Sequence, residues 1–120
     1  AGVRRVVYAS SGTYYGPRAT AHLAGVHESE GPNPLTPYGW SKWLGEQMCA
    51  MYTQVYGLPT VALRLFNPYG PGMSRANRMG EWLAMRRAGA VITVSGSPDQ
   101  YRDYCYVDDV VRAFIVAVSY

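Results

Sequence analysis

Short apolar runs alternate with longer amphipathic segments along almost the whole chain, and this alternation restricts the fold more than any other pattern in the sequence. The runs 6–9 and 60–66 have strand length and end in turn-forming residues, as strands buried on both faces of a parallel sheet do. Residues 91–94 predict a third strand, and residues 104–107 a brief extended piece. This order predicts right-handed β-α-β units, and therefore an α/β fold with a parallel sheet and helices on both faces.

Three segments carry the signals of helices. A helix over 37–56 is predicted by a capping threonine and a proline at its start, by apolar residues at three- and four-residue spacing, and by the glycine that follows it. Further helices are expected over 78–88 and over 110–118, the second with Asp108 as its cap. The segment 12–36 is rich in glycine and proline and predicts a long loop, which is uncommon unless the loop has a function.

The composition is that of a globular protein and disfavours several classes of partner. The net charge of +3 comes from scattered arginines and lysines, which gives little support for nucleic-acid binding and slightly favours an anionic small molecule. No apolar run approaches the roughly 20 residues of a membrane span, and the chain opens without a signal peptide. We therefore expect a cytoplasmic protein whose partners include neither a nucleic acid nor a membrane.

Two further features concern the state of the chain. Cys49 and Cys105 lie far apart, within apolar stretches and without a CxxC spacing, which predicts buried free thiols in a reducing compartment. The chain opens on Ala1 instead of a methionine and enters a strand within a few residues, which indicates a fragment of a longer protein.

Tyr38 and Lys42 place a phenol and an ammonium group four residues apart at the start of the predicted helix, where the two side chains share one face. A phenol with a pKa of about 10 is a poor base at neutral pH. The ammonium group and the positive end of the helix dipole both favour the phenolate. Such a pair can remove a proton from an alcohol while a hydride leaves its carbon. The alternative is that Tyr38 packs on the preceding loop and that Lys42 is solvated.

Ser11 follows the first predicted strand, at the end where parallel sheets bind their ligands. A hydroxyl there would meet a ligand held above the sheet, although serines after strands also serve as turn formers. The order of serine, tyrosine and lysine, each on its predicted element, is a rarer coincidence than any of the three alone. The three residues are therefore candidates for one catalytic site.

Four sequence blocks then carry a resemblance to a known family. They are VYASSGTYYG at 7–16, PYGWSK at 37–42, LRLFNPYGPG at 63–72 and RDYCYVDDV at 102–110. With these blocks in order, the chain resembles the extended short-chain dehydrogenase/reductase family of NAD-dependent epimerases and dehydratases, over nearly its whole length. The resemblance implies a Rossmann-like fold, in which 1–66 form the C-terminal part of the NAD-binding domain. Residues 67–120 would then supply segments of a small substrate-binding domain and a returning strand and helix.

The resemblance also implies catalytic and cofactor-binding roles. Ser11 matches the hydroxyl that hydrogen-bonds the reacting sugar oxygen, and Tyr38 matches the catalytic base. Lys42 matches the residue that holds the nicotinamide ribose and tunes the tyrosine. Phe66 matches a backbone contact to the nicotinamide. Ser11, Tyr38, Lys42 and Phe66 are thus the expected contacts of NAD.

For the substrate, the resemblance implies binding by Ser11, Asn67 and Arg102. Asn67 matches a substrate-binding amide, and Arg102 matches the arginine that pairs with the nucleotide diphosphate, which suits the bidentate recognition of phosphate by guanidinium. The alternatives are an asparagine that caps a turn and an arginine paired with Asp99 or Asp103.

The reaction implied by the resemblance is an epimerisation. Related 4,6-dehydratases place acidic residues directly after the catalytic hydroxyl, whereas this chain has Gly12 and Thr13 there. We therefore expect a nucleotide-sugar 4-epimerase of the UDP-glucose 4-epimerase type, acting through a 4-keto intermediate on a UDP-sugar. A 4,6-dehydratase or reductase of the same family, a non-sugar short-chain dehydrogenase and a non-catalytic binding module remain alternatives.

The chain lacks the Gly-rich fingerprint that binds the pyrophosphate of NAD, because the glycines at 70–72 do not follow a first strand and lack the third glycine. The 120 residues alone are thus expected to bind NAD poorly, to be inactive, and to be poorly soluble because a sheet edge and apolar faces are exposed. In the intact protein, we expect the apolar face of the 37–56 helix, with Trp40, Trp43 and Met51, to form a homodimer.

Two other groups of polar residues are given structural explanations. Asp108 and Asp109 could suggest a metal site or paired carboxylates, but their position at a helix start accounts for them. His22 and His27 have no partner at ligand spacing and are expected at the surface. No metal site is therefore predicted.

Overall fold

The computed structural model describes residues 2–20, 25–94, 96 and 99–120. Strands and helices are interspersed along the chain. They are β1 (Val6–Ser11), the 3₁₀ helix η1 (Gly12–Thr20), α1 (Pro37–Tyr56), β2 (Thr60–Leu65), β3 (Pro68–Tyr69), α2 (Arg78–Arg87), β4 (Cys105–Tyr106) and α3 (Val107–Ser119).

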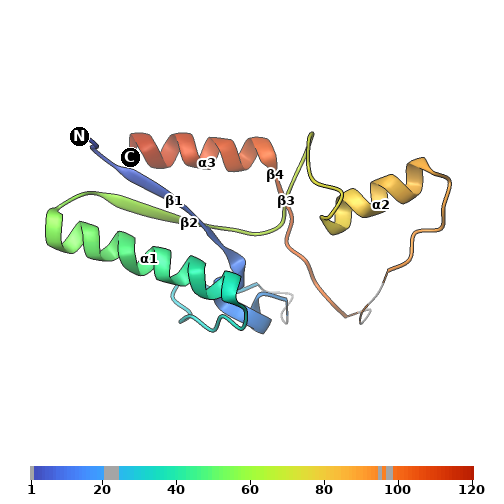
Figure 1. The fold of residues 1–120 in the computed structure, drawn as a ribbon, viewed down its shortest axis with the longest axis horizontal. Coiled ribbons are helices and arrows are strands. Elements are labelled where there is room, and N and C mark those ends of the chain that lie inside the picture. Colours follow the sequence, from blue (N-terminus) through green and yellow to red (C-terminus); the bar gives the residue numbers. More distant parts are fainter. Residues whose placement is uncertain (1, 21–24, 95, 97–98) are drawn as a thin grey trace.

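The centre of the fold is a parallel pair of strands covered on both faces. β1 and β2 pair in parallel, from Val6 opposite Thr60 to Ser11 opposite Leu65. α1 connects them and packs on one face, while α3 packs on the other (Figure 1). The predicted α/β architecture with a parallel sheet and helices on both faces is confirmed.

The bounds of α1 follow from its two caps. The Thr36 hydroxyl accepts a hydrogen bond from the Gly39 amide at 3.0 Å, and Pro37 occupies the first turn, where no amide donor is needed. At the other end, Gly57 adopts a left-handed φ of 64° and donates its amide to the Thr53 carbonyl. These local signals lie in the sequence itself, and the predicted helix over 37–56 is confirmed.

A second, smaller group of elements extends away from this centre. β3 and β4 pair in parallel, and α2, capped by Asn77, lies apart from the β1–β2 sheet (Figure 1). The molecule is consequently 54 Å long, with a radius of gyration of 16.8 Å, against roughly 14 Å for a compact chain of this length. This extended shape leaves many large apolar side chains exposed.

The predicted third strand over 91–94 is wrong. This segment has no regular structure, and Val91 and Val94 are 85% and 70% exposed. Valine and isoleucine fit strands only where a neighbouring strand supplies hydrogen bonds and packing, and within the described ranges no strand pairs with this segment.

The predicted loop over 12–36 is partly helical, because η1 occupies its first nine residues. η1 is interrupted at Gly16, which has φ of 60° and ψ of −138°. A Cβ atom at this position would lie 2.0 Å from the Asn33 carbonyl oxygen, so only glycine fits. The glycine and proline content predicted a loop, and the predicted loop is wrong over 12–20, where Gly16 interrupts a short helix.

The start of α3 also differs from the prediction. The helix begins at Val107, with Tyr106 at the cap position and no capping side-chain hydrogen bond. Asp108 and Asp109 occupy the first turn, where a carboxylate interacts favourably with the helix dipole. Asp109 also pairs with Arg112 at 3.3 Å on the surface. A helix-start explanation therefore suffices for both carboxylates.

Burial is lower than the sequence predicts. The expectation was strands buried on both faces, but Val6–Ala9 and all of β2 are only half-buried. Within the described part of the chain, each strand has a single neighbour, so both outer edges of the pair are open. Cys49 and Cys105 are free, as predicted, but they are half-buried instead of buried. Among the described residues, no helix is both long and apolar enough to cross a membrane.

Candidate functional site

Lys42 is held against the carboxyl end of β1. Its Nζ donates a hydrogen bond to the Ala9 carbonyl at 2.9 Å, and it lies 5.5 Å from the centre of the Tyr38 ring. Lys42 is half-buried and is held beside Tyr38. This position argues against the alternative in which Lys42 is a solvated surface residue. Tyr38 is 55% exposed, which leaves its hydroxyl open to a ligand.

Ser11 is the last residue of β1, and its side chain is buried. Its Oγ accepts hydrogen bonds from the Thr13 amide at 3.2 Å and from the Thr13 hydroxyl at 3.0 Å. A hydroxyl has two acceptor lone pairs and one donor proton. With two bonds accepted, the remaining capacity of Ser11 is donation, which suits a hydrogen bond to a ligand oxygen.

A pocket of about 320 Å³ opens at the same end of the sheet. Its lining includes four of the six residues singled out from the sequence, namely Ser11, Phe66, Asn67 and Arg102. These residues come from the ends of β1 and β2 and from the segment before β4. The pocket lining, as far as the chain is described, does not include Tyr38 or Lys42, which belong to α1.

Phe66 packs directly against the first residue after β1. A Cβ atom on Gly12 would lie 2.6 Å from the Phe66 ring, so this close approach requires glycine. The ring also stacks on Tyr15, with the two ring centres 6.1 Å apart. Phe66 thus holds the ends of β1 and β2 together at one wall of the pocket.

Asn67 and Arg102 have local contacts of their own. Asn67 has a positive φ of 30°, which asparagine tolerates better than most residues, and its Nδ2 donates to the Asp103 carbonyl at 2.8 Å. Arg102 is exposed and donates to Gln100 Oε1 at 3.4 Å. The Asn67 bond fixes the turn after β2 to the segment that carries Arg102, and so brings the two predicted substrate contacts to one pocket.

The structure also contains a buried charged residue that the sequence analysis overlooked. Glu46 on α1 is 9% exposed, and it accepts hydrogen bonds from Ser10 Oγ and from Arg64. Arg64 donates Nε to Oε1 at 3.0 Å and Nη2 to Oε2 at 2.8 Å, a bidentate ion pair. The hydrogen bonds to Glu46 are the main cause that raises the pKa of Arg64. In the sequence, the one sign of this ion pair was Arg64, a charged residue inside the apolar run of β2.

The Arg64 side chain also contacts the segment that follows β1. Its Nη1 donates to the Tyr15 hydroxyl at 2.6 Å and to the Glu28 carbonyl at 3.1 Å, and its guanidinium lies 3.6 Å from the centre of the Tyr14 ring. Both tyrosines are buried. The contacts of one half-buried arginine therefore join β2 to η1 and to the loop after it.

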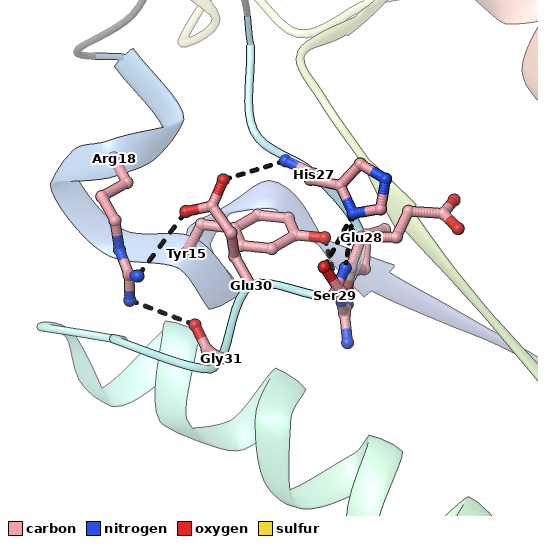
Figure 2. Close-up of polar contacts among 8 residues, drawn as sticks. Tyr15, Arg18, His27, Glu28, Ser29, Glu30 and Gly31 are labelled. Atoms are coloured by element: carbon pink, nitrogen blue, oxygen red, sulfur yellow. Dashed lines mark hydrogen bonds and ion pairs between the residues drawn. The ribbon is translucent and has the colours of Figure 1, made fainter.

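The loop 27–31 folds against η1 through polar contacts of its own (Figure 2). Arg18 pairs with Glu30 at 3.6 Å and donates to the Gly31 carbonyl, while Glu30 accepts from the His27 amide. His27 is exposed, as predicted, and its Nδ1 contacts Ser29 Oγ at 2.7 Å. His22 lies outside the described residues. These contacts hold the loop over the Tyr15 side of the site.

Cys49 lies one turn beyond Glu46 on α1, without the features of a reactive thiol. Burial and, secondarily, the negative charge of Glu46 raise the pKa of the Cys49 thiol above its ordinary value. The thiolate is the nucleophilic form, so a raised pKa keeps Cys49 protonated at neutral pH. Catalysis through a cysteine nucleophile at this position is therefore disfavoured.

The chain matches one family model and resembles known proteins over nearly its whole length. The model described as the NAD dependent epimerase/dehydratase family matches residues 1–120. An uncharacterized UDP-glucose epimerase of Bacillus subtilis is 32% identical over 117 residues, which are 98% of this chain and 36% of that protein. A trifunctional UDP-glucose 4,6-dehydratase, 3,5-epimerase and reductase of Arabidopsis thaliana is 30% identical and matches 97% of this chain and 17% of that protein.

A solved structure has the same fold over nearly the whole chain. The UDP-glucose 4-epimerase of Thermus thermophilus, in complex with NAD, superposes with a TM-score of 0.81 at 31% identity. The match covers 97% of this chain and 40% of that one. The chain thus spans well under half the length of the known proteins that it resembles.

Proposed function

The chain belongs to the NAD-dependent epimerase/dehydratase family, and because of this membership we propose that it supplies the catalytic middle portion of a nucleotide-sugar 4-epimerase. One observation carries the proposal. The pocket lined by Ser11, Asn67 and Arg102 opens at the carboxyl end of the β1–β2 pair, where Lys42 is bonded to the end of β1 beside Tyr38. Oxidation of an alcohol that carries a diphosphate requires a hydroxyl that donates a hydrogen bond to the reacting oxygen, a phenolate that accepts the proton, and a guanidinium that binds the diphosphate.

The residues present fit the nicotinamide end of NAD. The ammonium group of Lys42, held at the Ala9 carbonyl, and the hydroxyl of Ser11 are donors suited to a ribose and a reacting oxygen, and Phe66 lines the same pocket as Ser11. When bound there, NAD would accept a hydride from the sugar and return it. The Gly-rich turn that holds a pyrophosphate is absent from the 120 residues, so these residues fit only that end of the cofactor.

In the proposed mechanism, Tyr38 takes the proton of the sugar 4-hydroxyl as the hydride leaves the same carbon. The adjacent ammonium group of Lys42 stabilises the phenolate that performs this step. Ser11 donates a hydrogen bond to the reacting oxygen and holds it in place. The 4-keto sugar then turns over, and Tyr38 returns the proton when the hydride adds to the opposite face.

The substrate's diphosphate is assigned to Arg102, and a sugar or phosphate oxygen to the amide of Asn67. A guanidinium binds phosphate through two parallel hydrogen bonds, and the contact of Arg102 with Gln100, at 3.4 Å, is weak enough to be replaced. Similar solved structures contain UDP-glucuronic acid or UDP-glucose, which supports a nucleotide sugar as the substrate class. We extend this proposal to a UDP-sugar.

A dehydratase is the second candidate, because a relative with 4,6-dehydratase activity matches 97% of the chain. Against it, Gly12 and Thr13 occupy the two positions after the catalytic serine. The Phe66 ring fills the space that a side chain at Gly12 would need, and the Thr13 hydroxyl is bonded to Ser11. No acid or base for loss of water stands at these positions. Epimerisation therefore remains our proposal over elimination, reduction, or oxidation of a non-sugar alcohol.

The division of the chain and its location are further parts of the proposal. We assign residues 1–66 to the C-terminal part of the NAD-binding domain, and 67–120 to substrate-domain segments with a returning strand and helix. The packing of α3 on β1 and β2, with α2 lying apart, supports this division. The free thiols of Cys49 and Cys105 support a reducing, cytoplasmic compartment.

The proposed function is tested with the protein as its complete gene encodes it. The purified protein should contain NAD and should interconvert UDP-glucose and UDP-galactose, or their glucuronate counterparts, as followed by separation of the nucleotide sugars. A 4-keto-6-deoxy sugar as the product would favour the dehydratase instead. A protein that turns over no nucleotide sugar contradicts the proposed substrate class.

We also propose that the intact protein is a homodimer through the exposed apolar face of α1. Of the residues expected on this face, Trp40 is 47% exposed, whereas Trp43 and Met51 are half-buried. Leu44, Met48 and Val55, on the same side of the helix as Trp40, are between 52% and 61% exposed. Such a stripe on one long helix suits a two-fold helix pair. Replacing Leu44 by glutamate should convert the dimer to monomers in sedimentation equilibrium. The matched control is Leu83→Glu, which places the same charge on a leucine of α2 that is 45% exposed and should leave the dimer intact.

A further inference from the structure

The buried carboxylate of Glu46 is the centre of a network that links α1, β1, β2 and η1. Oε1 accepts hydrogen bonds from Ser10 Oγ and Arg64 Nε, and Oε2 accepts from Arg64 Nη2. Arg64 is the register partner of Ser10, so the network lies across the β1–β2 pair. A buried carboxylate is expensive unless it is paired and hydrogen-bonded, and here it is both.

The position of Glu46 along α1 relates this network to the catalytic pair. Glu46 is four residues after Lys42, which is itself four after Tyr38, so the three side chains leave one face of the helix. Lys42 is bonded to the Ala9 carbonyl, and Glu46 to the Ser10 hydroxyl. Side chains of α1 are therefore hydrogen-bonded to two consecutive residues of β1, immediately before Ser11.

Arg64, the second partner of Glu46, extends these contacts to residues that surround the site. Arg64 donates to the Tyr15 hydroxyl at 2.6 Å and to the Glu28 carbonyl at 3.1 Å. Tyr15 in turn stacks on Phe66, which lines the pocket beside Ser11. A shift of the ion pair would thus move the end of β1 and the segment after it together.

We propose that the Glu46–Arg64 ion pair is a positioning element that, through Ser10, sets Ser11 at its working distance from Tyr38 and Lys42. This inference rests on the proposed function for its activity readout. Neither Ser10 nor Glu46 is assigned a contact with substrate or cofactor. Their contribution is geometric, because Ser11 and the α1 pair belong to different elements that must be held together to within a fraction of an ångström.

The test removes only the link between the ion pair and β1. Ser10→Ala in the complete protein keeps Glu46 and Arg64 paired but deletes the hydroxyl that joins them to the strand. Because misplacement by about 1 Å can cost roughly a hundredfold in rate, we expect kcat to fall about ten- to a hundredfold while KM for the nucleotide sugar stays within about twofold. Amide hydrogen exchange at residues 11–13 should become faster.

A matched control is available at the other end of the same sheet. The Thr60 hydroxyl, like that of Ser10, links a strand to α1, through Thr53 Oγ1 at 2.8 Å and the Cys49 carbonyl at 3.1 Å. Thr60→Val should leave both kcat and the exchange at residues 11–13 unchanged. A role in general stability alone would make the two variants alike.

Several results would overturn the inference. Wild-type kcat in Ser10→Ala would do so, as would an equal loss of kcat in Thr60→Val, or a Ser10→Ala protein that does not fold. If the wild-type protein turns over no nucleotide sugar, the proposed function fails and hydrogen exchange decides the inference separately. Faster exchange at residues 11–13 in Ser10→Ala alone would then support it, and unchanged exchange would refute it.

Discussion

Replacing Tyr38 by phenylalanine should lower kcat of the complete protein by about a hundred- to ten-thousandfold, the usual contribution of a positioned general base. The substitution removes one oxygen from a side chain that is 55% exposed, so the fold and the free energy of unfolding should change little. Lys42 would keep its bond to the Ala9 carbonyl. The measurement is steady-state turnover of the nucleotide sugar, with far-UV circular dichroism to verify the fold.

The control for this variant lies on the same helix. Tyr56 is in the last turn of α1, is 68% exposed, and packs its ring against Tyr52. Tyr56→Phe removes the same atom at the opposite end of the helix and should turn over at the wild-type rate. Turnover by Tyr38→Phe as fast as that of Tyr56→Phe would exclude Tyr38 as the base.

The second large effect is on stability. Glu46→Ala should lower the free energy of unfolding by about 3 to 5 kcal/mol, because it leaves the Arg64 charge half-buried without its counterion. Four hydrogen bonds, three from Arg64 and one from Ser10, also lose their acceptor. Urea unfolding followed by tryptophan fluorescence measures the change.

An exposed ion pair in the same chain provides the comparison. Arg78 and Glu81 are as close as 3.0 Å, but their side chains are 52% and 44% exposed. Surface pairs contribute about 1 kcal/mol or less, so Glu81→Ala should change the stability by no more than that. If Glu46→Ala were no worse than Glu81→Ala, the Glu46–Arg64 pair would have no special role in the fold.

The elements that the sequence predicted well are those whose signals are local. α1 is bounded by a capping threonine, a proline and a terminal glycine within its own segment, and its limits match the prediction. The strand over 91–94 was predicted from the same kind of apolar run as β2. It fails because a strand needs a partner, and partners are set by parts of the chain distant in sequence.

The candidate site shows the same difference between residues with a local sequence signal and residues that meet only in the folded chain. Ser11, Tyr38 and Lys42 are candidates because their order and spacing form a motif, whereas Glu46 and Arg64 are 18 residues apart and on different elements. They meet because α1 packs against β2, which brings Arg64 Nε to 3.0 Å from Glu46 Oε1. Pairing between a helix and a strand is therefore the part of the site that the sequence pattern did not contain.

The parallel pairing of β1 and β2 also has a consequence for synthesis on the ribosome. Each residue of β1 pairs with one 54 positions later, as Val6 does with Thr60 (60 − 6 = 54). At a translation rate of about 5 to 20 residues per second, β1 waits roughly 3 to 11 s before its partner exists. During that interval the side of β1 that later pairs with β2 has no β2 beside it, whereas α1, which is complete earlier, can already cover one face of β1.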